Sequence, residues 1–153
     1  MGKVLKILHI KDLLDKVVDL DLEGCGFVLT FPDEVLAREY NGIGPEFLNP
    51  NIRAKVTSWF HIFEPAALIH DMRNYLSDGE RLNFEKANKE FLDNCLKIAD
   101  STYPLWRLSR RKLARLVARL LYEFVQSDFG WRAWLDCYKK TLSNKNQTPI
   151  KEN

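Results

Sequence analysis

The chain has 153 residues, of which 46% are hydrophobic and 29% are charged, and its formal net charge is +2. A chain of this length and composition can bury one hydrophobic core, which excludes a disordered chain and favours a single domain. The near balance of charge gives no overall attraction to nucleic acid, and we do not expect nucleic acid as a partner. Three cysteines without a C-x-x-C pair indicate reduced thiols, not a disulfide framework or a zinc site of that type.

No targeting or membrane-spanning segment is recognisable in the sequence. Lysines and acids interrupt the apolar residues of the opening segment MGKVLKILHIKDLLDK, unlike the continuous apolar stretch of a signal peptide. No window approaches the roughly 18 consecutive apolar residues of a membrane span. We therefore expect the protein to be cytoplasmic as synthesised.

The first part of the chain predicts a short helix, a short strand and a long loop. Apolar residues at helical spacing predict a helix over Ile10–Leu20. The β-forming segment Phe27–Phe31 is the best strand candidate, so we expect at most one short strand or hairpin near residues 26–31. Prolines and glycines over Pro32–Pro50 predict mostly loop, after a possible helical turn at Asp33–Arg38.

The rest of the chain predicts four helices, whose ranges share apolar residues at steps of three and four. These ranges are Pro65–Ser77, Asn83–Ala99, Ser109–Gln126 and Phe129–Leu142. With the first helix they predict a mainly α fold, a compact bundle of about five helices in a single domain over residues 1–142. The polar residues 143–153 are expected to form a flexible tail.

Two of these helices have a predicted core face. The apolar stripe of the helix over Asn83–Ala99 contains one polar residue, Asn88, and its other members are Phe84, Ala87, Phe91, Cys95 and Ile98. On the next helix we expect five apolar residues to face inward: Leu113, Leu116, Val117, Leu120 and Phe124. Both helices should therefore pack through these stripes.

A row of arginines lies on the helix over Ser109–Gln126. Arg111, Arg115 and Arg119 are spaced one turn apart, in a basic segment without an acid. Such a row can bind phosphates of a lipid or of nucleic acid. The alternative is a solvated face whose arginines pair with nearby carboxylates. The three arginines are candidates for phosphate or membrane contact.

The helix over Pro65–Ser77 carries a histidine outside its core stripe. His70 lies off the stripe of Leu68, Met72 and Tyr75, and its row neighbours are the small or polar Ala66, Ala67 and Asn74. This arrangement predicts space beside the imidazole, as a general base requires. Asp71 points about 100° away around the helix and could bind a cation next to His70. Because a His-Asp pair is frequent by chance, a structural role also stays open.

A glycine-containing loop precedes this helix. The segment Tyr40–Gly44 reads YNGIG, and His70, Asp71 and then Tyr75 follow it. This arrangement resembles the phospholipase A-two superfamily, whose calcium loop reads Y-x-G-x-G and whose catalytic helix carries H-D and a tyrosine. The viral members lack the disulfide framework of the extracellular enzymes and continue with A-D-x-x-F, where this chain has ANKEF at Ala87–Phe91.

The resemblance implies a calcium site and a catalytic histidine. Calcium would be held by the carboxylate of Asp71 and by the backbone carbonyls of Tyr40, Gly42 and Gly44. His70 would activate water for attack on a lipid ester, while calcium stabilises the oxyanion. A phospholipid membrane surface would then be the partner.

The resemblance also places Asn88 opposite His70, where the family has an aspartate. The amide oxygen of Asn88 can accept the imidazole N–H and orient the ring. It cannot offset the positive charge that forms when the ring takes a proton, so the replacement predicts reduced activity.

A second pattern adds residues near the end of the chain to the same two motifs. These residues are Tyr122, Val125, Phe129, Gly130 and Trp134. The extended pattern resembles small bacteriophage proteins of unknown activity. The leading hypothesis is therefore a phage-type or prophage-type, phospholipase-like lipid ester hydrolase. The alternative is a non-enzymatic phage or virion-associated structural or interaction protein, with phage proteins as partners and a degenerate His-Asp site.

Overall fold

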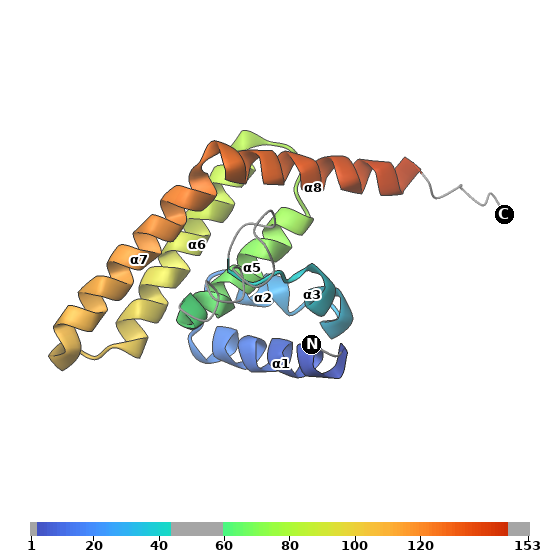
Figure 1. Ribbon diagram of the computed structural model, residues 1–153. Helices are drawn as coiled ribbons and strands as arrows, with labels where there is room; N and C mark the ends of the chain where they lie inside the picture. Colours follow the sequence, from blue (N-terminus) through green and yellow to red (C-terminus); the bar gives the residue numbers. More distant parts are fainter. Residues whose placement is uncertain (1–2, 44–59, 147–153) are drawn as a thin grey trace.

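The computed structural model describes residues 3–43 and 60–146, and most of these residues are helical (Figure 1). The α-helices are α1 (Lys3–Asp19), α2 (Cys25–Val28), α3 (Asp33–Glu39), α5 (Glu64–Tyr75), α6 (Arg81–Thr102), α7 (Leu108–Gln126) and α8 (Asp128–Asn146). Two 3-10 turns, η1 (His61–Phe63) and η2 (Leu105–Arg107), precede α5 and α7. No strand occurs within these two described ranges, and the predicted mainly α fold is confirmed.

Helix α6 lies between two groups of helices (Figure 1). On one side it packs against α5, which in turn packs against α1 and α3. On the other side α7 returns alongside α6, and the two form a long helical hairpin that ends at η2. Helix α8 packs against α7 and α5. This arrangement leaves one face of α7 on the outside of the hairpin.

The hydrophobic core joins α1, α3, α5, α6 and the inner face of α7. Its most deeply buried side chains include Ile10, Leu13, Val17, Leu36, Leu68, Met72 and Ile98. The stripe predicted on α6 is confirmed, because all six of its residues are buried. A smaller cluster forms where Trp134 of α8 covers Phe84 and Ala87 of α6. Helix α6 therefore has packed neighbours along most of its length.

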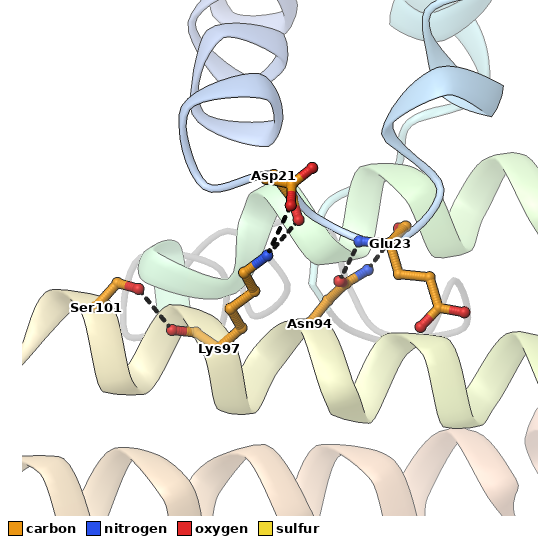
Figure 2. Close-up of polar contacts among 5 residues, drawn as sticks. All are labelled: Asp21, Glu23, Asn94, Lys97 and Ser101. Carbon is orange, nitrogen blue, oxygen red and sulfur yellow. Dashed lines mark hydrogen bonds and ion pairs between the residues drawn. The ribbon is translucent and has the colours of Figure 1, made fainter.

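The turn between α1 and α2 is fixed to α6 by polar contacts (Figure 2). The side chain of Asn94 accepts a hydrogen bond from the N–H of Glu23 at 2.8 Å and donates one to its carbonyl at 2.9 Å. Lys97 donates to the backbone carbonyl of Asp21 and lies 3.5 Å from its carboxylate. Asp21 and Gly24 have positive φ values of 45° and 85°, so the chain reverses sharply here. The amide of Asn94 thus pairs with the backbone of the turn.

The strand candidate Phe27–Phe31 is not a strand, because the chain forms α2 and a turn there; the expectation of at most one short strand allows this. The N–H of Val28 donates to the carbonyl of Gly24 at 3.0 Å. The rings of Phe27 and Phe31 meet edge to face with their centroids 5.2 Å apart. The described residues provide no second strand for pairing, whereas a helical turn satisfies its own backbone groups. Local β propensity is overridden by this requirement.

The observed helices also differ from their predicted limits. Helix α1 begins at Lys3, well before the predicted start at Ile10. Helix α8 continues to Asn146, four residues into the segment expected to be a tail, and residues 147–153 lie outside the described residues. Helix ends are the least determined part of a periodic pattern, because a helix continues past its last core contact until a cap or breaker stops it.

The predicted inner face of α7 is largely wrong. Leu113, Leu116, Leu120 and Phe124 are 61%, 52%, 61% and 39% exposed. Of the predicted set only Val117 packs, partly buried, against the core. The buried residues of α7 are the small Ala114 and Ala118. Because small side chains allow two helices to approach closely, the alanine side of α7 faces α6 and the leucines stay outside.

Candidate functional site

His70 and Asn88 meet in the core, as the sequence predicts. Nε2 of His70 lies 2.8 Å from Oδ1 of Asn88. The amide Nδ2 of Asn88 donates to Oε1 of Gln126 at 2.8 Å, so its Oδ1 is the acceptor toward the ring. Nε2 of His70 therefore carries the proton, and the lone pair of Nδ1 faces Nδ2 of Asn74 at 3.4 Å.

The predicted space beside the imidazole is filled. His70 is only 9% exposed, and the ring of Phe91 lies 5.0 Å from it, centroid to centroid. The prediction failed because it considered only neighbours on the same helix, whereas the space is taken by a side chain of α6. Burial lowers the pKa of His70, and the hydrogen bond with Asn88 opposes this effect. A neutral imidazole is therefore favoured at pH 7.

The contacts of His70 belong to a chain of polar groups across three helices. We call Asn74, His70, Asn88 and Gln126 the buried amide chain; its centre, His70 and Asn88, is buried, its ends are partly buried, and it links α5, α6 and α7. Asn88 is fully buried, so each of its polar atoms needs a partner. The sequence reasoning found Asn88 because it interrupts an apolar stripe, but it missed Gln126. Nothing in the spacing of α7 indicates which residue at its end reaches α6.

The loop after α3 lies beside Asp71, as predicted, but its contact is of a different kind. The N–H of Asn41 donates to Oδ2 of Asp71 at 3.0 Å, where the sequence predicts that backbone carbonyls face the carboxylate across an ion. Gly42 has a φ of 80°, which favours glycine. Gly44, a further predicted calcium ligand, lies outside the described residues.

The described residues give limited support to a calcium cage. Among them, no group of three or more His, Cys, Asp and Glu side chains is placed to hold a metal ion. Calcium usually takes six to eight oxygen ligands, and Asp71 supplies one carboxylate whose Oδ2 already accepts an N–H. The hydroxyl of Tyr40 is directed to a different carboxylate, that of Glu64. Because the predicted ligands are backbone carbonyls and include Gly44, the calcium site stays a prediction.

A buried carboxylate that the sequence reasoning missed lies nearby. Glu64 is 7% exposed, and its Oε2 accepts a hydrogen bond from the hydroxyl of Tyr40 at 2.7 Å. Nε2 of His9 lies 2.7 Å from the same oxygen. Burial, and then the contact with Glu64, raise the pKa of Tyr40. An acid within the apolar run WFHIFEPAAL was the available signal, and the contact joins α1, the residue that follows α3, and α5.

Two of the three candidate arginines on α7 are paired with an acid. Nε of Arg111 donates to Asp100 at 2.7 Å, and Arg115 donates to both oxygens of Asp100 at 3.0 and 2.8 Å. These bonds, with Arg111 contributing most, lower the pKa of Asp100. Arg119 is exposed and has no ion pair within the described residues. The alternative interpretation therefore holds for Arg111 and Arg115.

Around the third arginine lies an exposed surface of mixed character. We call Leu113, Leu116, Leu120 and Phe124 the α7 apolar face. At the end of the hairpin, Leu105 and Trp106 of η2 are 74% and 84% exposed. Four exposed cations have no ion pair within residues 3–43 and 60–146: Arg107, Arg110, Lys112 and Arg119. The structure thus places unpaired positive charge next to apolar surface.

An open pocket of about 510 Å³ lies elsewhere, where α2, α5, α6 and α8 meet. None of the predicted site residues lines it. Its walls carry charges of both signs, including the bidentate pair of Arg73 and Glu90. The indole N–H of Trp134 has no partner in the described structure. The balanced charges do not select one class of ligand.

Comparison with protein families, curated proteins and solved structures finds no match for this chain. The resemblances to phospholipases and to bacteriophage proteins therefore stay predictions. Within residues 3–43 and 60–146, none of the helices has the length and hydrophobicity that a membrane span requires.

Proposed function

We propose that this protein is a non-catalytic binding domain that presents the outer side of α7 to a partner. The observation that carries the proposal is the exposure of the α7 apolar face, four large side chains in consecutive turns of one helix. Contiguous apolar surface of this kind on a folded protein marks an interaction site. On the other side of α7, Ala114, Val117, Ala118, Leu121 and Val125 already pack against the core.

The exposed side chains of the α7 apolar face leave stabilisation available to a partner. Burying a leucine or phenylalanine side chain is worth about 1.5–3 kcal/mol. Leu113, Leu116 and Leu120 are each more than half exposed in the folded protein. Folding therefore gains only part of the stabilisation that burying these side chains would provide. Polar residues at these positions would serve a solvated helix equally well. A partner that covers the face would recover the unused stabilisation.

The state of His70 supports binding in preference to catalysis. A general base needs a ring nitrogen that reaches the substrate directly or through one water. Nε2 of His70 is engaged by Asn88, Nδ1 faces Asn74, and the ring is buried against Phe91. The role of the buried amide chain is then structural: its hydrogen bonds connect α5, α6 and α7.

Calcium-dependent lipid ester hydrolysis is the second candidate function. Two observations favour it: Asn88 faces His70 at 2.8 Å, and the loop N–H of Asn41 contacts Asp71 at 3.0 Å. These contacts bring together the motifs on which the resemblance to phospholipases rests. In that function His70 would accept a proton through Nδ1, and calcium would have to recruit oxygen ligands beyond Asp71.

Two measurements test the proposal. Retention on a phenyl resin should fall in Leu113→Gln/Leu120→Gln, and not in the matched variant Leu5→Gln/Leu8→Gln, which changes two exposed leucines of α1. Unchanged retention in the α7 variant would show that the face is not accessible and would overturn the proposal. Fatty acid release from mixed phospholipid vesicles should not exceed background at millimolar calcium. Calcium-dependent release that His70→Ala abolishes would establish the second candidate instead.

A further inference from the structure

We infer that the partner of the α7 apolar face is the surface of an anionic phospholipid bilayer, on which η2 and α7 lie. This inference rests on the proposed binding function and adds the chemistry of the partner. It depends on how apolar side chains and unpaired cations are distributed around α7 and at the end of the hairpin.

The cations lie along both edges of the apolar face. With 100° per residue, the four residues of the face fall within an arc of about 80°. Lys112 and Arg119 lie within about 60° of one edge, and Arg110 lies within about 40° of the other. Long basic side chains can place their apolar stems against lipid while the charges stay at the phosphates. This distribution is typical of a helix that lies in the membrane interface.

The end of the hairpin, at η2, also combines exposed apolar side chains with a cation. Leu105 and Trp106 are the two most exposed large apolar side chains of the hairpin, and Arg107 follows them. Tryptophan is favoured at the boundary between lipid and water, because its ring is apolar and its N–H is polar. Figure 1 shows that η2 lies at the far end of the α6–α7 hairpin, away from α8. The hairpin can therefore approach a flat surface along its outer edge.

The charges of α7 disfavour a second copy of the chain as the occupant. The helix contains five basic residues and one acid, Glu123, which lies in its last turn on the same edge as Lys112 and Arg119, so cations still outnumber acids along that edge. Packing two α7 helices through their apolar faces would bring Lys112 and Arg119 of both copies to one interface, and like charges across an interface oppose association. An anionic lipid surface has the opposite charge along its whole area.

The same features disfavour nucleic acid. Phosphate backbones would satisfy the cations, but they would leave the leucines of the face in water. Binding to nucleic acid depends mainly on phosphate contacts and base edges, and neither covers apolar surface of this extent. A bilayer offers phosphates and acyl chains within one surface, so it matches both parts of the site.

The experiment measures binding of the full chain to sedimented vesicles of phosphatidylcholine, with and without about one third phosphatidylglycerol. We expect binding only to the anionic vesicles, and weaker binding at high salt because salt screens the exposed charges. Arg107→Gln/Lys112→Gln/Arg119→Gln should weaken binding about a hundredfold, since each cation near an anionic surface contributes about fivefold. Leu116→Gln/Leu120→Gln should weaken it more than about tenfold.

Matched control variants test whether the loss of binding is specific to η2 and α7 or follows from a change in net charge or in exposed apolar surface. Lys16→Gln/Lys86→Gln/Lys140→Gln removes three exposed cations outside η2 and α7, and Leu5→Gln/Leu8→Gln removes two exposed leucines of α1. Both control variants should bind anionic vesicles within about threefold of wild type, because none of these residues lies on the proposed surface. Melting temperatures of all variants should match, since every substituted side chain is exposed.

Three outcomes would overturn the inference. Equal loss of binding in the control variants would show that net charge or general hydrophobicity is responsible. Equal binding to neutral and anionic vesicles would remove the role of the cations. Absence of vesicle binding, together with a concentration-dependent dimer that Leu116→Gln/Leu120→Gln abolishes, would assign the face to a second copy. In this last case the proposed binding function survives, whereas it fails if the phenyl-resin retention is also unchanged.

Discussion

The buried amide chain and the α7 apolar face are opposite departures from the usual distribution of side chains. In the first, polar groups of His70 and Asn88 lie in the core, and each finds a partner within the protein. In the second, leucines lie in water and find none in the described residues. A satisfied polar group in a core is explained by the fold itself, whereas exposed apolar surface is explained by something outside it. The exposed surface of α7 is therefore the better candidate for a functional site.

Substitution of Asn88 should give the largest effect on stability. Asn88→Leu keeps the branching of the side chain but leaves the N–H of His70 and the amide of Gln126 without their partner, which should cost about 3 kcal/mol. Chemical denaturation of wild type and variant measures this difference. Asn83→Leu, at an exposed position of the same helix, is the control and should cost less than about 1 kcal/mol. Equal costs would mean that the buried amide chain does not brace the helices.

Acid should reveal the burial of His70. Because burial lowers the pKa of this histidine in the folded state, the unfolded chain binds its proton more readily. The stabilisation from the neutral ring is fully present above the unfolded pKa of about 6.5 and declines as the pH falls toward the folded value.

The decline can be assigned to His70 with one variant. Between pH 8 and pH 5, the melting temperature should fall more steeply for wild type than for His70→Gln, which has no titrating ring. Parallel curves would indicate that the ring is accessible to solvent in the folded protein. That result would again favour a catalytic His70, because the buried amide chain would then be open to solvent, as the α7 apolar face is.

The smallest expected effect is that of substituting Asp100. Its carboxylate pairs with two arginines and so neutralises part of the positive charge of α7. Asp100→Asn removes one negative charge and releases Arg111 and Arg115, so binding to anionic vesicles should strengthen severalfold. Stability should change little, because ion pairs at a protein surface contribute little. Sedimentation with the same vesicles measures the change. Weaker binding in this variant would mean that the pairing with Asp100 is needed to shape the lipid-binding surface.

Helical periodicity was sufficient to predict the centre of the molecule. The stripe on α6 is correct, and Asn88 is buried within it. That Asn88 faces His70 followed from the resemblance, because His70 lies off the apolar stripe of its own helix. The proximity of the 40–43 loop to Asp71 also followed from the resemblance. The contact between them did not, since sequence motifs do not determine whether a backbone N–H or a carbonyl faces a side chain.

Periodicity failed at α7 because the apolar arc of this helix is wider than one packing face. Val117, Leu121 and Val125 continue the arc beyond the leucines, and Ala114 and Ala118 complete its far side. A pattern of spacing cannot decide which half of such an arc faces the core. The two alanines decide it, because they let α7 approach α6 closely. The strand predicted near Phe27 failed for a related reason, since β propensity does not show whether a pairing strand exists.

The position of Trp106 relative to a bilayer tests the central claim most directly. Brominated phospholipids quench tryptophan fluorescence at the depth of the bromine atoms, and the chain has four tryptophans. The account predicts that anionic vesicles with bromine near the headgroups quench wild-type fluorescence and that Trp106→Phe loses most of this quenching while still binding. Quenching that is unchanged in Trp106→Phe would show that a different part of the molecule meets the lipid and would contradict the account.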